Sequence, residues 1–357
     1  MSKAELIRAG VVHAPGTAPV MEDVELALPR DTEVLIRIES SGVCHTDVAY
    51  AAGEFFPEFP VVLGHEIAGI VEAIGARVDR VRLGDRVVFT VDRHCGVCRH
   101  CLAGHPVLCQ SGIDVEQPPR LRLRGDAVVH GMGGFAEATV LDQRSLTRVP
   151  HDVSADVAAV VGCAVTSGAG AVFNVARPRP GESVTVVGLG GVGLSAVMGA
   201  AVVGAHPIIA VDPDATRRAL ALEVGAHIAV PPSRDEIERS LPGGSDVVIE
   251  SAGTVDAMTF ALELTSRGGR MVLMGAPPPG TRLPVDVHEL LLGQRQLLTC
   301  LAGDIVPERD YQLLFRLYLS GQLDLDRLVT GHVDLLDLGA GFEECRLHRG
   351  IRTLVHP

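Results

Sequence analysis

The chain has 357 residues, of which 47% are hydrophobic and 21% charged, and its formal net charge is -13. This length favours two domains over a single core, and the negative charge argues against non-specific binding of nucleic acid. The N-terminus lacks the apolar run of a signal peptide, so we expect a cytoplasmic protein that binds neither nucleic acid nor membrane.

Short β-like runs separated by glycines characterise the first part of the chain. Residues 33–38, 69–74 and 85–90 are rich in Val and Ile and lie between turn residues. This pattern predicts a mostly antiparallel β domain. The one basic run, residues 120–124, alternates Arg with Leu, and it predicts the exposed face of a strand rather than a binding patch.

The pattern changes near residue 155, where apolar strands begin to alternate with helical segments. We predict strands at 183–187, 207–211, 245–250 and 269–274, and helices at 191–203 and 215–224. This alternation is typical of a parallel, doubly wound α/β sheet.

The tail beyond about residue 302 returns to short strands and one helix, at 309–319. We therefore assign residues 1–164 and 302–357 to the first domain and residues 165–301 to the second. Two apolar stretches, 157–176 and 184–211, are interrupted by small and polar residues. We interpret each as a buried strand followed by a buried helix, not as a membrane span.

Four of the 8 cysteines form a cluster with the spacing C-x2-C-x2-C-x7-C, namely Cys95, Cys98, Cys101 and Cys109. Four thiolates at such spacing predict a closed, tetrahedral structural zinc site in a lobe at about 94–110. An iron–sulfur cluster and redox thiols are the alternatives, although no Cys-Pro follows the run. With four cysteines available, we expect the neighbouring histidines to lie on the surface, namely His94, His100 and His105.

A second set of metal-ligand types is spread along the chain. Cys44 follows Gly-Val, His65 lies between Gly64 and Glu66, and Cys163 follows Gly162. Each residue alone is typical of a core. Together they supply two thiolates and one imidazole, which is the ligand set of a catalytic zinc with an open fourth position.

A G-x-G-x-x-G motif, Gly188-Leu-Gly190-Gly191-Val192-Gly193, follows the strand at 183–187 and opens a helix. The first glycine allows a tight turn, the second lets a pyrophosphate approach, and the third lets the helix pack on the strand. Asp212 ends the next strand, where a carboxylate binds the ribose hydroxyls and repels a 2′-phosphate. This favours NAD over NADP; the alternative is that Asp212 caps the following helix.

In this order, the motifs make the chain similar to the zinc-dependent medium-chain dehydrogenase/reductase family, specifically its alcohol dehydrogenases, over essentially its full length. The resemblance implies a Rossmann domain beside a GroES-like catalytic domain, and two zinc ions per chain. Cys44, His65 and Cys163 would hold the catalytic zinc, and Cys95, Cys98, Cys101 and Cys109 the structural one.

The resemblance also implies roles for the neighbouring residues. Asp47 would accept a hydrogen bond from His65 and fix its tautomer, and Glu66 would lie behind the metal. Thr46 would contact the substrate oxygen and begin the proton relay. His45 and Arg352 would contact the pyrophosphate, and Arg217 matches a basic position near the ribose.

Two positions depart from the family pattern. Ala49 stands where many members end the proton relay on a histidine, so the relay must end on water or on another group such as His45. Val91 stands where a pocket aromatic is common. Phe55, Phe56 and Phe59 would line the substrate pocket or pack in the core. The segment 111–140 is long, as in the dimeric branch of the family, so the resemblance implies a homodimer rather than a tetramer.

The expected reaction is the oxidation of a primary alcohol (aliphatic, allylic or aryl) to its aldehyde, or the reverse, with hydride transfer to NAD. The first alternative is a thiol-dependent formaldehyde dehydrogenase acting on an S-hydroxymethyl thiol. The non-enzymatic alternative is a zinc-stabilised nucleotide-binding protein, because a fold does not dictate a function.

Overall fold

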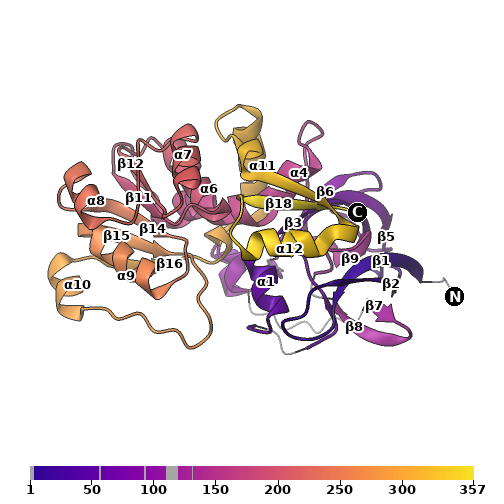
Figure 1. Cartoon of the computed structure of the whole chain (residues 1–357). Helices are drawn as coiled ribbons and strands as arrows, with labels where there is room; N and C mark the ends of the chain where they lie inside the picture. Colours follow the sequence, from indigo (N-terminus) through magenta and orange to yellow (C-terminus); the bar gives the residue numbers. More distant parts are fainter. Residues whose placement is uncertain (1–3, 56–57, 92–93, 110–119, 131) are drawn as a thin grey trace. The chain divides into compact units, whose positions relative to one another are not determined.

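The computed structural model describes residues 4–55, 58–91, 94–109, 120–130 and 132–357 (Figure 1). The chain forms two compact units. Unit 1 comprises Met1–Cys163, Val306–Phe315 and Leu325–Pro357, and unit 2 comprises Ala164–Ile305 and Arg316–Asp324. The predicted boundaries differ from these units mainly at 316–324. Helix α11 (Pro307–Leu319) has 13 residues and is roughly 20 Å long. The boundary between the units falls within it, because residues up to Phe315 belong to unit 1 and residues from Arg316 belong to unit 2.

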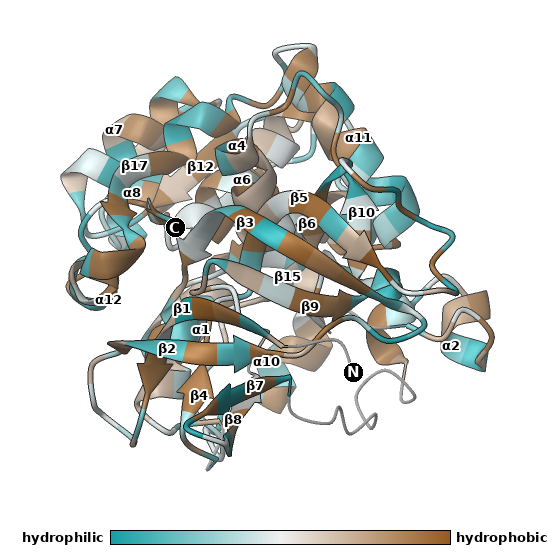
Figure 2. Cartoon of the chain, turned by 90° about the vertical axis from the view of Figure 1, so that its right-hand side faces the viewer, coloured by the Kyte–Doolittle hydropathy of each residue, from teal (hydrophilic) through white to brown (hydrophobic). Residues whose placement is uncertain are grey.

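Unit 1 contains two β structures (Figure 2), which agree with the predicted mostly antiparallel domain. The first is a closed barrel of β1 (Glu5–Val12), β2 (Val20–Leu26), β7 (Leu121–Leu123), β8 (Asp126–His130) and β4 (Val61–Val62). The second is a sheet in the order β10 (Leu146–Arg148), β6 (Arg86–Phe89), β5 (Glu66–Ile74), β3 (Glu33–Val43), β18 (Arg352–His356) and β17 (Val329–Asp334), with β9 (Ala138–Asp142) also paired to β3.

Strand β3 is the centre of the second sheet. It pairs with β5, β9 and β18, and its side chains are almost all buried. Its Val and Ile residues suit a strand that is covered on both faces. Short helices flank this sheet: α1 (His45–Ala51), α4 (Ala155–Val160) and α12 (Leu338–Arg346), which lies beside β18 in Figure 1. Helix α12 was not predicted from the sequence.

The arginines of the basic run, residues 120–124, differ in their exposure to solvent. Arg122 and Arg124 are exposed and Leu121 is buried, as the alternation predicts. Arg120 is different, because it is buried and forms an ion pair with Glu33. The prediction of an exposed face was therefore wrong for Arg120. Its partner is far away in the sequence, so no local pattern reveals the pair.

Unit 2 is a six-stranded parallel sheet, which confirms the predicted Rossmann fold. The strand order is β13 (Ile228–Val230), β12 (Ile208–Val211), β11 (Val184–Val187), β14 (Ser245–Glu250), β15 (Thr265–Leu273) and β16 (Gln296–Thr299). Numbered within the unit, this is the order 3-2-1-4-5-6 of dinucleotide-binding folds, whose switch point lies between β11 and β14. The helices are α5 (Thr166–Gly170), α6 (Gly191–Val202), α7 (Ala215–Glu223), α8 (Arg234–Ser240), α9 (Val255–Leu264) and α10 (Val287–Gly293).

The two apolar stretches have different structures. Residues 184–211 form β11, α6 and β12, as predicted. Residues 157–176 contain no strand, because α4, α5 and two π-helical turns (Val161–Val165 and Ala171–Ala176) form one helical run. Periodicity cannot separate a buried strand from a buried helix in a uniformly apolar segment. Among the described residues, this run (Ala155–Ala176) is the one helix long and apolar enough to cross a membrane, but 78% of its apolar window is buried inside the protein.

Candidate active site

Cys44 and His65 are brought together by the pairing of two neighbouring strands. Cys44 directly follows β3 and is the N-cap residue of α1, and His65 directly precedes β5. The antiparallel register places Gly42 opposite Glu66, so both side chains lie at the same end of the strand pair. Cys44 is 9% exposed and His65 is 6% exposed.

Asp47 fixes the orientation of His65. Its carboxylate accepts hydrogen bonds from the backbone N–H of Cys44 at 3.0 Å and of Gly64 at 3.1 Å, and it lies 3.1 Å from Nδ1 of His65. Burial lowers the pKa of His65, but the Asp47 carboxylate and the Cys44 sulfur together offset this effect and leave the pKa raised. Because Nδ1–H donates to Asp47, the lone pair of Nε2 is directed away from it and is available to a metal.

Cys163 lies on a π-helical turn, Val161–Val165. Its Sγ is 3.5 Å from Nε2 of His65. The buried Tyr311 hydroxyl donates to the carbonyl oxygen of Gly162 at 3.2 Å and lies 3.4 Å from that of Phe89. Such turns frequently occur at functional sites, and here Tyr311 anchors the turn one residue before the thiol.

Glu66 and Arg352 form a buried ion pair behind these ligands. Arg352 Nε lies 3.3 Å from Glu66 Oε2, and Arg352 Nη1 donates to the carbonyl oxygen of Val43 at 3.0 Å. Burial raises the pKa of Glu66 to about 7. Both carboxylate oxygens lack a well-aligned hydrogen bond, so they retain lone pairs directed into the cluster.

The four side chains fit a metal ion. One ligand atom each from Cys44, His65, Glu66 and Cys163 lies within 4.8 Å of all the others. Sulfur and nitrogen ligands of one tetrahedral zinc lie roughly 3.5 Å apart. The Cys163 thiol, together with Arg352 and His65, lowers the pKa of Cys44 well below its usual range. The cluster therefore offers a thiolate, a second sulfur and an oriented imidazole, with a carboxylate beside them.

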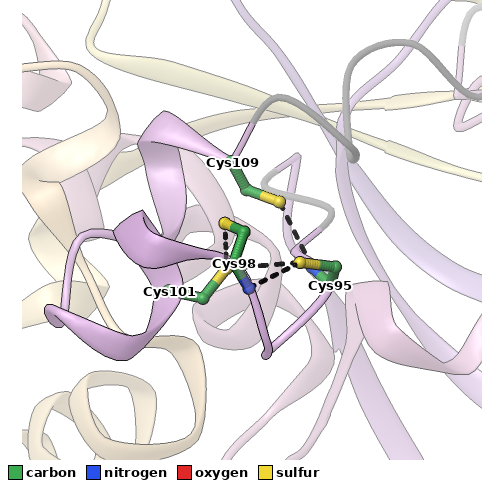
Figure 3. A group of neighbouring side chains, drawn as sticks. All are labelled: Cys95, Cys98, Cys101 and Cys109. Atoms are coloured by element: carbon green, nitrogen blue, oxygen red, sulfur yellow. Dashed lines mark hydrogen bonds between the residues drawn. The ribbon is translucent and has the colours of Figure 1, made fainter.

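The predicted structural lobe brings its four sulfurs together (Figure 3). Sγ of Cys101 is 3.5 Å from that of Cys98 and 3.9 Å from that of Cys95, close to the roughly 3.8 Å expected around tetrahedral zinc. Hydrogen bonds from the backbone N–H groups of Val97 and Cys98 lower the pKa of Cys95 to about 6. All four positions are filled by sulfur, so this donor set is closed.

The histidines near the lobe do not belong to the described cysteine cluster. His105 is exposed, and His100 is half-buried beside Arg99. His94 is buried, with its Nε2 at 3.4 Å from Glu308 Oε1, so its prediction as a surface residue was wrong. Glu308 lies at the start of α11, far along the chain, so no local pattern around His94 predicts this contact.

The glycine motif has the geometry of a dinucleotide turn. Gly188 has a φ of +90°, and a Cβ there would lie 2.8 Å from the backbone nitrogen of Ala252. A Cβ on Gly193 would overlap the carbonyl oxygen of Gly188, whereas a Cβ on Gly190 would meet nothing within 4 Å. The space beside Gly190, at the N-terminus of α6, therefore fits a pyrophosphate.

Asp212 lies beside this turn at the end of β12 and is 5% exposed. Its two carboxylate oxygens accept hydrogen bonds from the backbone N–H groups of Leu189 and Asp214, both at 2.8 Å. The cap of α7 is Asp214, which accepts from the N–H groups of Thr216 and Arg217. The alternative interpretation of Asp212 as the helix cap was therefore wrong.

Comparison with known proteins identifies the family. The alcohol dehydrogenase GroES-like domain matches residues 30–151 and the zinc-binding dehydrogenase domain matches residues 191–320. The chain is 34% identical to an NDMA-dependent alcohol dehydrogenase of Amycolatopsis methanolica over 98% of each chain. It is 33% identical to an S-(hydroxymethyl)glutathione dehydrogenase of a Synechocystis species, over 98% of this chain and 99% of the relative. Benzyl alcohol dehydrogenase from Acinetobacter calcoaceticus has a similar structure, with a TM-score of 0.93 and 29% identity over 99% of each chain.

The chain belongs to the zinc-dependent medium-chain dehydrogenase/reductase family, among its alcohol dehydrogenases. In this alcohol dehydrogenase, Thr46 is half-buried in the first turn of α1, two residues after Cys44. His45 is exposed, with Nε2 at 2.9 Å from Nδ1 of His348 and Nδ1 at 3.6 Å from the Cys345 Sγ. His348 was not predicted, because it approaches His45 only through the fold.

Two of the predicted pocket residues lie near one core cluster. Phe59 packs against this cluster, and the half-buried Phe55 contacts Tyr50, which packs against the same cluster, edge-on at a ring distance of 5.3 Å. Val91 is 37% exposed. Phe56 lies outside the described residues. Sequence reasoning did not single out Tyr50, whose pKa is raised by burial.

Proposed function

We propose that this alcohol dehydrogenase oxidises a primary alcohol, whether aliphatic, allylic or aryl, to the aldehyde, or catalyses the reverse reaction, with NAD as the hydride carrier. The observation that carries the proposal is the set of two cysteines and an oriented histidine, Cys44, Cys163 and His65, of which Cys44 and His65 are buried. A zinc ion held there would act as a Lewis acid that lowers the pKa of the alcohol. Bound NAD would supply the hydride acceptor.

The surrounding residues have distinct tasks under this proposal. Asp47 keeps Nε2 of His65 directed at the metal position. The Arg352 guanidinium offsets part of the negative charge of the two cysteines and Glu66, and all of these groups are removed from bulk water. Charges that are buried together need such compensation.

The proton of the alcohol would leave through Thr46. Ala49 has no group that transfers protons, so the relay cannot continue along α1 to that position. His45 is exposed and adjoins His348, and we assign to this pair the transfer to water. If Thr46 begins this relay, Thr46→Val lowers kcat and leaves the zinc content unchanged.

The preference for NAD rests on Asp212. Its buried carboxylate is held next to the glycine turn by the backbone of Leu189, where a 2′-phosphate would meet its negative charge. Arg217 lies on the first turn of α7 and would approach the same ribose. We expect Asp212→Ser to reduce the ratio of kcat/KM with NAD to kcat/KM with NADP.

The structural lobe would hold a second zinc ion. Its four sulfurs lie within 4.8 Å of one another, and the backbone N–H groups of Val97 and Cys98 stabilise the thiolate of Cys95. Because no open position is left, this metal would brace the lobe without taking part in the reaction.

A homodimer is supported by the free edge of the parallel sheet. Among the described residues, β16 pairs only with β15. Apolar residues on and near this edge are exposed, namely Val287, Leu291, Leu292, Leu297 and Leu301. A second copy would cover such an edge. A dimeric mass in light scattering, reduced to the monomer by Leu291→Lys with Leu301→Lys, supports this assignment.

A second candidate function is the oxidation of an S-hydroxymethyl thiol, which is favoured by the relative of that activity at 33% identity. It uses the same metal and nucleotide sites, so only the substrate separates the two candidates. Strict dependence of formaldehyde oxidation on an added low-molecular-weight thiol selects this function. Turnover of simple primary alcohols without a thiol selects the first.

One experiment tests the proposal as a whole. The purified protein is mixed with NAD or NADP and a panel of primary alcohols, the reduced cofactor is followed by its absorbance, and zinc is measured in the same sample. We expect turnover with NAD and two zinc ions per chain. One zinc ion per chain and no turnover with any substrate would contradict the proposal and favour a nucleotide-binding protein.

A further inference from the structure

A third group of metal-ligand side chains lies in unit 1, apart from both cysteine clusters. It consists of Asp156 in the first turn of α4, His332 on β17 and His356 on β18. Nε2 of His356 is 2.8 Å from Asp156 Oδ1, and Nδ1 of His332 is 3.8 Å from Asp156 Oδ2. One ligand atom from each residue lies within 4.8 Å of the other two.

The fold holds the three side chains in place. Strands β17 and β18 are parallel, with Asp334 opposite His356 and His332 opposite Leu354. Side chains two residues apart on a strand share one face, so His332 and His356 are directed to the same side of the sheet. Their rings meet edge-on at 5.0 Å. Asp156 approaches from the first turn of α4.

The distances fit one cation between the three groups. Nitrogen and oxygen ligands about 2.1 Å from a metal lie roughly 3.0–3.4 Å apart, and the two measured separations of 2.8 and 3.8 Å lie on either side of this range. Two imidazoles and a carboxylate suit first-row transition metals. Asp334 and Asp337 line a recess together with His332 and His356, and they add negative charge beside the two imidazoles.

We propose that Asp156, His332 and His356 bind a divalent transition-metal ion at a third site, with only nitrogen and oxygen ligands from the protein. The alternative is a simple surface ion pair between Asp156 and a protonated His356. That pair needs one histidine, whereas the structure directs two imidazoles at the same carboxylate. A half-exposed pair is also worth little by itself, but a metal ion would join all three elements.

The site connects to the elements that carry the catalytic cluster. Helix α4 continues directly into the π-helical turn of Cys163, and β18 begins with Arg352. A metal ion bound by Asp156 and His356 therefore connects the start of α4 to the end of β18. Its binding raises the melting temperature of the protein, because only the folded state brings the three ligands together.

Cobalt(II) is a suitable probe, because thiolate and non-thiolate sites differ in their absorption. The purified protein, with its tightly held zinc in place, is freed of weakly bound metal on a chelating resin and titrated with Co²⁺ in a calorimeter and a spectrophotometer. We expect one Co²⁺ per chain with ligand-field bands and without thiolate-to-cobalt charge transfer. His332→Ala, His356→Ala and Asp156→Asn should each weaken binding by roughly tenfold or more.

His151→Ala is the matched control. His151 is an exposed histidine that lies 3.3 Å from Asp152, so it forms a pair of the same type without a third ligand, and we expect unchanged Co²⁺ binding. Circular dichroism and dehydrogenase turnover show that each variant is folded. The absence of non-thiolate Co²⁺ binding, or equal affinity in His332→Ala and the wild type, would overturn the proposal. Loss of Co²⁺ binding in His356→Ala but not in His332→Ala would contradict the three-ligand site and would show that the group is an ion pair of Asp156 with His356.

Discussion

The two cysteine clusters of this alcohol dehydrogenase are built in opposite ways. The four sulfurs of the lobe come from residues 95–109, and three of the four cysteines are only half-buried. Cys44, His65 and Cys163 come from a strand end, a second strand and a helix, and Cys44 and His65 are buried. A closed site can therefore be encoded by local spacing, whereas the open site depends on the fold of the whole unit.

The electrostatic support of the sulfurs differs in the same way. In the lobe, backbone N–H groups lower the pKa of Cys95 to about 6. In the buried cluster, the Cys163 thiol, Arg352 and His65 lower the pKa of Cys44. Side chains from distant segments thus replace the backbone donors. Substitutions that surround the buried cluster should affect the reaction, and substitutions in the lobe should affect stability.

The largest effect is expected for Cys44→Ser. Loss of this ligand removes the Lewis acid, which is worth several kcal/mol, so kcat/KM should fall by roughly a thousandfold or more. Steady-state kinetics and zinc content measure the effect, and one zinc ion per chain should remain in the lobe. Cys300→Ser is the control, because Cys300 is buried outside both clusters. Full turnover of Cys44→Ser with its zinc retained would refute the assigned site.

Cys98→Ser should instead destabilise the protein. A ligand present at a thousandfold excess over its Kd stabilises the folded state by about 4 kcal/mol, and loss of the lobe zinc removes this contribution. Denaturant unfolding and zinc analysis test it, with turnover measured where the variant is still folded. His100→Ala, in the same lobe but outside the ligand group, should keep both metals. Loss of turnover in folded Cys98→Ser would show that the lobe takes part in the reaction.

Asp47→Asn should have an intermediate effect. The amide keeps the size of the side chain, but it no longer supplies two acceptor oxygens to Cys44 N–H, Gly64 N–H and His65. Removal of such a partner of a metal-binding histidine lowers metal affinity or activity by roughly 10- to 100-fold. Zinc competition with a chelator and kcat/KM measure this. Asp23→Asn, an exposed acid on β2, is the control, and equal values for the two variants would contradict the role of Asp47.

The sequence was most informative where chemistry and spacing are local. The four-cysteine lobe, the glycine turn and the alternation of strands and helices in unit 2 follow from short-range patterns, and the structure contains each of them. The two groups of possible metal ligands could be named because few residue types bind zinc, and the structure brings the members of each group together. The family resemblance indicated which of those residues share one metal ion.

Features created by tertiary contacts could not be predicted. The ion pairs of Arg120 with Glu33 and of Arg352 with Glu66 join distant segments. The stretch at 157–176 was misread because it is apolar over most of its length, so its periodicity does not separate a buried strand from a buried helix. The Tyr311 hydroxyl donates to the carbonyl oxygen of Gly162 in the π-helical turn of Cys163, and no motif marks Tyr311.

Tyr311→Phe should have the smallest effect. It tests whether a contact from a distant segment positions Cys163. The variant removes the hydroxyl that donates to the Gly162 carbonyl at 3.2 Å, and leaves that oxygen without this donor one residue before Cys163. The loss of one buried hydrogen bond costs about 1 kcal/mol of unfolding free energy, and the displaced turn should lower kcat/KM by roughly fivefold or less. Denaturant unfolding and steady-state kinetics measure both effects.

Tyr318→Phe, on the same helix but in its last turn, is the comparison for this prediction. Both variants lose one hydroxyl from α11, and the Tyr311 hydroxyl donates to the turn of Cys163. If both lower the unfolding free energy and only Tyr311→Phe lowers kcat/KM, the hydroxyl positions the thiol. If their kcat/KM values are equal, the Tyr311 hydroxyl does not position Cys163. The open site then depends less on contacts between distant segments than the comparison with the closed site suggests.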